Sequence, residues 1–139
     1  MSPVDEHASI TTTRRVQWAD TDASGWYHNT VVLRWIEEAE NELLDRAGVL
    51  QEVIARIPRV HIEVDYRKVL RFWDEVEVHV AVAEVGRSSV SFRFDVRHQG
   101  EVAAEGSYRA VLVSEEQKPL PWSEEHRLRL LAPTPPAGG

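Results

Sequence analysis

The chain has 139 residues, with 16 basic and 23 acidic side chains and a net charge of −7. This length is typical of a single domain that forms a core without disulfides or metal ions. The absence of cysteine excludes disulfides, thiolate zinc sites and a cysteine nucleophile, and it agrees with a reducing cytoplasm. No basic cluster dominates, and no apolar stretch reaches the length of a membrane helix. We therefore expect a cytoplasmic protein that binds neither nucleic acid nor membranes.

The two ends differ in composition from the rest of the chain. Residues 1–9 are polar, lack the pattern of a signal peptide, and are expected to be flexible. The end, "APTPPAGG" at residues 132–139, is rich in Pro and Gly and is expected to be a disordered tail. The domain is therefore expected to span residues 10–131.

The first predicted elements are a strand and a long helix. Residues 11–18 form the strand candidate, with Arg14, Val16 and Trp18 on one side. The helix follows, with Asn29 or Thr30 as its cap and Gly48 as its stop, and with i,i+4 pairs such as Arg34/Glu38 on its exposed side. Its apolar stripe recurs every three or four residues: Val32, Trp35, Ile36, Ala39, Leu43 and Ala47.

Beyond residue 58 the apolar residues alternate with polar ones. Four strands are predicted, over residues 60–66, 76–82, 90–96 and 102–112, and the separators "RFWDE", "VGRSS" and "HQGE" are typical of hairpins. A sheet with one dry face needs a cover, and the long helix is the only element large enough. The sequence thus predicts an α+β fold of order β-α-β-β-β-β, a five-stranded antiparallel sheet wrapped around one helix.

Two smaller features complete the expected fold. Residues 123–131 are predicted to form a short C-terminal helix. The outer face of the sheet is partly apolar, which favours dimerisation through that face. The side chains expected there are Ala81, Ala83, Ala103, Val111 and Val113.

Common catalytic motifs are absent: the sequence has no G-x-S-x-G elbow, H-E-x-x-H motif or phosphate-binding loop. His61, Glu63 and Asp65 share one face of a predicted strand at intervals of about 6.6 Å, which is loose for one ion. A solvated polar face explains these residues equally well. We expect no metal site and no separate cofactor.

The segment "DTDASG" at residues 20–25 allows two interpretations. Aspartates before a helix form Asx turns and caps, and Gly25 suits a positive φ, so both carboxylates could be structural. A carboxylate beside the unpaired N–H groups of a helix N-terminus could also act on a polarised carbonyl, as acyl-transfer hydrolysis requires. Composition and spacing leave both interpretations open.

A longer pattern carries a family resemblance. The stretch "WADTDASGWYHNTVVLRWIEEAENELLDRAG", followed by "VDYRKVLRFWDEVEVHV", resembles hotdog-fold acyl-CoA thioesterases of the 4-hydroxybenzoyl-CoA thioesterase type. Members of that family read approximately D-x-D-x-x-G, then Y-L-R-W-x-E-x-A, then V-D-Y-x-x-P-L-x-x-G-D-E-V. The match covers residues 12–131 in the right order. The resemblance implies the hotdog fold and hydrolysis of an acyl-CoA or of an acyl group on a carrier protein.

The resemblance also implies roles for individual residues. Asp22, the second aspartate of the motif, would be the nucleophile or the general base, and Asp20 would hold the turn. An amide N–H around Asn29 would polarise the thioester carbonyl. His28 is either a second polar contact to the substrate or a residue that fills the helix entry. The family's sites lie at a dimer interface, so a homodimer or homotetramer is implied.

Several residues depart from the family pattern. Where many relatives have small or valine-like residues after Gly25, this chain has Trp26, Tyr27 and His28, and Val31-Val32 stands where Asn-Tyr or Arg-Tyr is common. These changes fall in the region of the acyl pocket, so the substrate does not follow from the family name. We expect the acyl group to contact Gly25, Trp26, Tyr27 and Val32.

Two further departures fall beside the second predicted strand. Trp73 replaces the usual turn glycine, and Val69 replaces the usual proline. Basic residues lie in the same segment and in a later hairpin, and they are candidates for the phosphates of coenzyme A, although ordinary surface charge explains each one alone. The candidates are Arg67, Lys68, Arg71, Arg87 and the neighbouring Ser88.

Three functions are compatible with the sequence. An acyl-CoA or acyl-carrier-protein thioesterase ranks first because Asp22 is intact. A non-catalytic acyl-thioester-binding protein ranks second because residues 26–32 depart from the family. An enoyl-thioester hydratase ranks third, since hydratases of this fold present D-x-N-P-x-H, whereas Asp22 and His28 lie six residues apart with no N-P between them.

Overall fold

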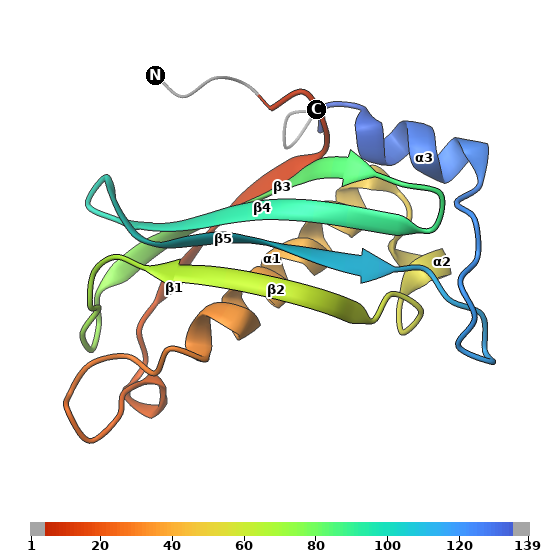
Figure 1. The fold of residues 1–139 in the computed structure, drawn as a ribbon. Coiled ribbons are helices and arrows are strands. Elements are labelled where there is room, and N and C mark those ends of the chain that lie inside the picture. The colour runs from red at the N-terminus through yellow and green to blue at the C-terminus, as the bar shows by residue number, and fades with distance from the viewer. Residues whose placement is uncertain (1–4, 135–139) are drawn as a thin grey trace.

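The structure is a computed structural model that describes residues 5–134. One antiparallel sheet curves around the long helix α1 (Val31–Ala47), so the predicted α+β hotdog fold is confirmed (Figure 1). The sheet order is β1-β3-β4-β5-β2. The strands are β1 (Ser9–Arg15), β2 (Arg59–Tyr66), β3 (Glu75–Val85), β4 (Ser89–His98) and β5 (Glu101–Val111).

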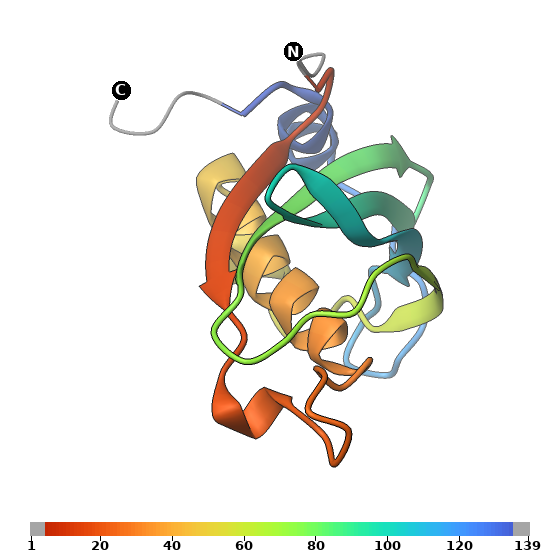
Figure 2. The ribbon, with the colours of Figure 1, turned by 90° about the vertical axis from the view of Figure 1, so that its left-hand side faces the viewer.

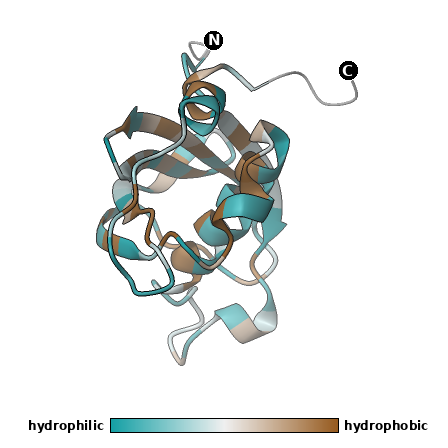
Figure 3. Cartoon of the chain, turned by 90° about the vertical axis from the view of Figure 1, so that its right-hand side faces the viewer, coloured by the Kyte–Doolittle hydropathy of each residue, from teal (hydrophilic) through white to brown (hydrophobic). Residues whose placement is uncertain are grey.

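Burial of α1 against the concave face of the sheet forms the core. The predicted apolar stripe is buried except at its last residue, Ala47, which is partly buried. It meets inward-facing residues of β3, β4 and β5 such as Val78, Phe92 and Tyr108. The hydrophobic stretches, drawn brown in Figure 3, lie along these strands. The helix ends as predicted at Gly48, whose φ of 78° lets its N–H bond the Asp45 carbonyl at 3.0 Å. Removal of this apolar surface from water is the main driving force for folding.

The connection between β2 and β3 differs from the prediction. The separator "RFWDE" is not a hairpin turn, because β2 pairs with β5 at one edge of the sheet while β3 lies between β1 and β4. Residues 67–74 therefore cross the end of the sheet (Figure 2). Alternation of apolar residues reports which face of a strand is buried, but it carries no information about which strands are neighbours. Most of β2 is exposed.

The first strand is shorter than predicted. β1 ends at Arg15, and the chain then enters the 3-10 turn η1 (Trp18–Asp20). Val16 stays buried, and its N–H bonds the Asp74 carbonyl at 2.9 Å. Trp18 is 76% exposed instead of sharing the buried face of Val16.

The C-terminal part of the described chain packs against its beginning. Helix α3 (Glu124–Leu131) is present as predicted, and Ser123 caps it by accepting a hydrogen bond from the His126 N–H. Ala8 is buried and donates its N–H to the Leu130 carbonyl at 3.1 Å. In the segment expected to be flexible, His7 and Ala8 thus contact the end of α3, while Glu6 is exposed. Residues 1–4 and 135–139 lie outside the described part.

The remaining expectations concern the sheet surface and the helices. Ala81 and Ala103 are buried within the chain, so the apolar outer face is smaller than predicted. Besides α1 and α3, residues 5–134 contain one short α-helix, α2 (Leu50–Val53). Within residues 5–134, the helices are all too short or too polar to cross a membrane.

Candidate active site

The loop between η1 and α1 is anchored by Asp20. Its side chain is only 2% exposed, and its carboxylate accepts hydrogen bonds from the Gln17 N–H and from Arg34 Nη2, each at 2.8 Å. The Asp20 carbonyl accepts a further bond from the His28 N–H at 2.7 Å. Asp20 thus holds the loop to the helix, as expected from turn chemistry. The predicted Arg34/Glu38 pair is wrong, because Arg34 is engaged with Asp20.

Asp22 is exposed on the same loop. Its Oδ1 accepts hydrogen bonds from the Ser24 hydroxyl and from the Ser24 N–H, the latter at 2.8 Å. These bonds favour the ionised carboxylate and lower the pKa of Asp22 below its ordinary value. Asp22 is therefore charged at neutral pH and open to a ligand.

A cavity of about 280 Å³ lies beside Asp22, between the loop and the β2–β3 connection. The connection is fixed to the loop by a bridge between Trp26 and Arg71 and by the bond from the Tyr27 N–H to the Leu70 carbonyl at 2.8 Å. Figure 2 looks onto this end of the molecule, where both segments meet near the start of α1. The wall consists of Asp22, Trp26, Tyr27, Asn29, Tyr66, Arg67, Lys68 and Val69.

Asn29 stands at the entry to α1. Its carbonyl accepts a hydrogen bond from the Tyr66 hydroxyl at 2.6 Å. Among residues 5–134, no acceptor is bonded to the N–H of Asn29 or of Thr30. Free N–H groups at a helix N-terminus are suited to bind an oxyanion.

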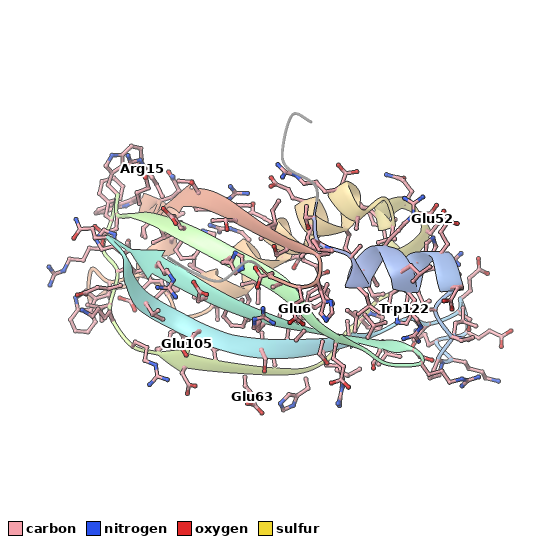
Figure 4. The ribbon with its side chains drawn as sticks, turned by 90° about the horizontal axis from the view of Figure 1, so that it is seen from above. Glu6, Arg15, Glu52, Glu63, Glu105 and Trp122 are labelled. Atoms are coloured by element: carbon pink, nitrogen blue, oxygen red, sulfur yellow. The ribbon has the colours of Figure 1, made fainter. Side chains whose placement is uncertain are left out.

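Some residues predicted for the site lie elsewhere. His28 is exposed but is not part of the cavity wall. Gly25 is also outside the wall and has a φ of 86°. Val32 is completely buried in the core. Arg87 and Ser88 lie in the β3–β4 turn, where their carbonyls bond Trp122 and Leu112. That turn is at the opposite end of the sheet, near the label of Trp122 in Figure 4. One chain therefore does not bring all the predicted residues together.

The two cations at the cavity have acidic neighbours. Arg67 lies 3.8 Å from carboxylate oxygens of Asp65 and Glu105, and Lys68 pairs with Glu101. All of these side chains are exposed, so the pairs are weak and a phosphate could replace the carboxylates. His61 bonds Glu63 at 2.9 Å. Within residues 5–134, no group of three or more His, Asp or Glu side chains is arranged to hold a metal ion.

Tyr27 is the one aromatic residue of the cavity wall that is almost fully buried, with 7% exposed. Its ring stacks on Trp35 at 6.2 Å and meets Tyr66 edge-on at 6.5 Å. Its hydroxyl is buried with no hydrogen-bond partner among the described residues. Burial raises the pKa of Tyr27 to about 12, so the hydroxyl stays protonated and can donate a hydrogen bond.

A second, larger groove was not foreseen from the sequence. It has a volume of about 930 Å³ and lies between α1, α2 and the beginning of β2. Glu40 lines it, almost buried, and its Oε1 accepts hydrogen bonds from the Tyr108 hydroxyl at 2.7 Å and from Arg59 Nη2 at 3.4 Å. Burial raises the pKa of Glu40. Most of the remaining wall is apolar, including Leu44 and Ile54.

A five-stranded antiparallel sheet wrapped on one long helix is the hotdog fold. The chain belongs to the Thioesterase-like superfamily, which it matches over residues 16–132. It is a thioester hydrolase of that superfamily. Tyr66 of its "VDY" motif lines the cavity, although the sequence predicted it only as the last residue of a strand.

Individual relatives agree with this assignment. The chain is 27% identical over 130 residues to a 1,4-dihydroxy-2-naphthoyl-CoA hydrolase of Synechococcus, covering 82% of both chains. It is 30% identical to the enzyme of that name from Prochlorococcus marinus, covering 70% of this chain and 72% of the relative. A Thermus thermophilus thioesterase crystallised with coenzyme A and Zn superposes with a TM-score of 0.80 at 29% identity. The superposition covers 91% of this chain and 94% of the thioesterase.

We predict that Tyr27→Phe stabilises the protein. A buried hydroxyl without a hydrogen-bond partner costs free energy, because it gives up its bonds to water on folding. Its removal should therefore raise the free energy of unfolding by about 1 kcal/mol. Urea denaturation measures it. Tyr108→Phe is the matched control and is expected to lower stability, because the Tyr108 hydroxyl bonds Glu40. Equal effects of the two substitutions would contradict the prediction.

Proposed function

We propose that the protein hydrolyses an acyl-CoA thioester and that Asp22 carries the reaction. The observation that supports this most directly is an exposed, ionised carboxylate that shares a cavity with Asn29, whose N–H has no acceptor among residues 5–134. As nucleophile, Asp22 would attack the thioester carbonyl and expel the thiolate, leaving a mixed anhydride that water hydrolyses. As general base, it would take a proton from the water that attacks the carbonyl. Both routes yield the free acid and the thiol.

The N–H of Asn29 is the proposed donor to the carbonyl oxygen. Negative charge develops on that oxygen as the tetrahedral intermediate forms, and a donor held in place before the reaction stabilises it without reorganisation. The bond from Tyr66 to the Asn29 carbonyl would fix the orientation of this segment. His28, bonded through its backbone to Asp20, would close the loop rather than take part in the chemistry.

We propose that the complete site forms between two copies of the chain. Tyr66, at one end of β2, lines the cavity of Asp22, and Arg59, at the other end, lines the larger groove. If the exposed edges of two β2 strands pair antiparallel about a twofold axis, the cavity of each copy meets the groove of its partner. The smaller cavity then holds the thioester, and the partner's groove holds the acyl group.

The acyl group is proposed to be aromatic. The wall of the larger groove, which would hold the acyl group, is mostly apolar. Two relatives are named for the hydrolysis of an aromatic acyl-CoA, 1,4-dihydroxy-2-naphthoyl-CoA. Arg67 and Lys68 would exchange their exposed carboxylate partners for phosphates of coenzyme A. Arg87 and Ser88 could contribute only from the second copy.

Asp22→Asn tests the catalytic role. We expect kcat for an aryl-CoA to fall by about 10²–10⁴-fold, because the amide neither attacks nor accepts the proton, while thermal unfolding stays unchanged. Thiol release measures the rate. Asp20→Asn provides the contrast and is expected to lower stability, since it removes the buried charge opposite Arg34. Turnover preserved in Asp22→Asn would exclude the mechanism; binding without turnover in the native protein would favour the non-catalytic alternative.

Ser24→Ala tests the electrostatics of Asp22. The substitution removes the hydroxyl bond that lowers the pKa of Asp22, so this pKa should rise. Activity needs the ionised carboxylate and falls as the pH drops through its pKa, so the acidic limb of kcat/KM should move to higher pH. The pH profile measures the shift, with Ser107→Ala on β5 as the control. An unmoved acidic limb would mean that another group controls it.

Mixing two inactive variants tests the shared site. Asp22→Asn lacks the carboxylate, and Ile54→Trp places an indole in the larger groove from an exposed position. A mixed dimer keeps one intact site, so remixing the two variants equally should restore about a quarter of native activity. No recovery in a mixture whose subunits have exchanged would show that each chain works alone.

A further inference from the structure

An exposed cluster of aromatic side chains lies at the same end of the sheet as Asp22. Trp18, Phe72 and Trp73, here named the aromatic patch, are 76%, 48% and 53% exposed. Trp18 meets Phe72 edge-on at 5.5 Å, and Phe72 lies 5.9 Å from Trp73. In Figure 4 this is the end marked by Arg15. None of the three residues belongs to the hydrophobic core, and each exposes about half or more of its side chain to water.

The backbone of Trp73 adds a second cost. The Asp74 N–H bonds the Arg71 carbonyl at 3.1 Å, which makes residues 71–74 a β-turn with Trp73 at its third position. Trp73 has φ of 72° there, a conformation that glycine adopts freely and that a bulky residue adopts only under strain. A strained residue with an exposed ring is typical of a functional position.

Cationic groups surround the patch. Arg15 lies over the Trp73 ring, 4.8 Å from its centroid, and donates from Nη1 to the Trp73 carbonyl at 3.0 Å. Arg71 is exposed, and its side chain forms no ion pair within residues 5–134. Planar rings beside the guanidinium group of Arg71 suit a ligand that carries both a base and phosphates.

A hollow of about 460 Å³ adjoins Trp73, and Asp22 is not part of its wall. Arg15, Arg97 and His98 line it together with the acidic residues Asp74, Glu75 and Glu77. Asp74 already accepts the Arg71 N–H, and Glu75 pairs with Arg15 at 3.0 Å. The acidic groups therefore make the hollow itself a poor site for phosphate, and they leave Arg71 and the exposed ring faces as the binding surface.

The patch is connected directly to the candidate active site. The backbones of Arg71 and Trp26 form an isolated β-bridge. The Trp26 carbonyl in turn accepts a hydrogen bond from the Asp22 N–H at 2.8 Å. A ligand whose reactive group sits at Asp22 therefore passes Arg71 and the patch if it extends along the β2–β3 connection. Coenzyme A has this form, a thiol arm joined to a phosphorylated adenosine.

We propose that the aromatic patch binds the nucleotide end of coenzyme A, with adenine stacked on Trp73 or Trp18 and phosphate paired with Arg71. This assignment rests on the proposed function. It accounts for a tryptophan at a turn position whose positive φ suits glycine: stacking with the base would offset the backbone strain.

Calorimetric titration with free coenzyme A and with pantetheine tests the assignment without turnover. Trp73→Gly and Arg71→Gln should each weaken coenzyme A binding about tenfold, the scale of one stacked base or one charged contact. Pantetheine binding should not change. Leu128→Ala, at an exposed position on α3, is the matched control. The melting temperature should not fall in Trp73→Gly, because glycine relieves the positive φ.

Kinetics with an aryl-CoA and its pantetheine thioester completes the test. We expect KM to rise for the CoA ester alone, with kcat unchanged. Native-like affinity for coenzyme A in Trp73→Gly overturns the assignment, and so does an equal loss for both thioesters. A loss seen only with an acyl carrier protein would reassign the patch to protein docking. Nucleotide-dependent binding by a native protein without turnover would refute the proposed function and leave this assignment intact.

Discussion

The position of β2 at the edge of the sheet is the constraint from which the candidate site follows. Two strands, β4 and β5, stand between β2 and β3, so the chain must cross the end of the sheet after Tyr66. The crossing segment meets the Asp22 loop there and is held by the Leu70 and Arg71 contacts. A simple hairpin would leave the loop without this second wall. The cavity is thus a product of strand order as much as of the aspartate motif.

The two aspartates of the loop lie in contrasting environments, which suit the structural role of Asp20 and the catalytic role proposed for Asp22. Asp20 is buried, and its carboxylate accepts hydrogen bonds from an arginine and a backbone amide, so a ligand cannot reach it. Asp22 is exposed, and its partner Ser24 belongs to the same turn, so the carboxylate stays ionised and accessible. The rigidity of the first supports the placement of the second.

The spacing of apolar residues predicted the helices and strands, because this spacing follows directly from which side of each element is buried. The stripe of α1 and the alternation along β3 to β5 needed no further information. The motif around Asp22 came from the family resemblance, and the structure adds the Ser24 contacts. The larger groove escaped prediction, because Glu40 reads as an ordinary helix carboxylate and its partner Tyr108 lies 68 residues away. Such pairs depend on strand order, which alternation does not encode.

The exposed edge of β2 has a consequence for the protein's behaviour at high concentration. An open strand edge recruits further strands and is a common origin of aggregation. Along β2 the side chains of His61, Glu63 and Asp65 alternate with apolar ones and resist a dry, extended stack. In the twofold assembly proposed above, one pairing event consumes this edge in both copies. No free strand edge then remains on that side of either sheet, so further strands cannot add there. The edge that could start aggregation instead limits the assembly to two copies on that side.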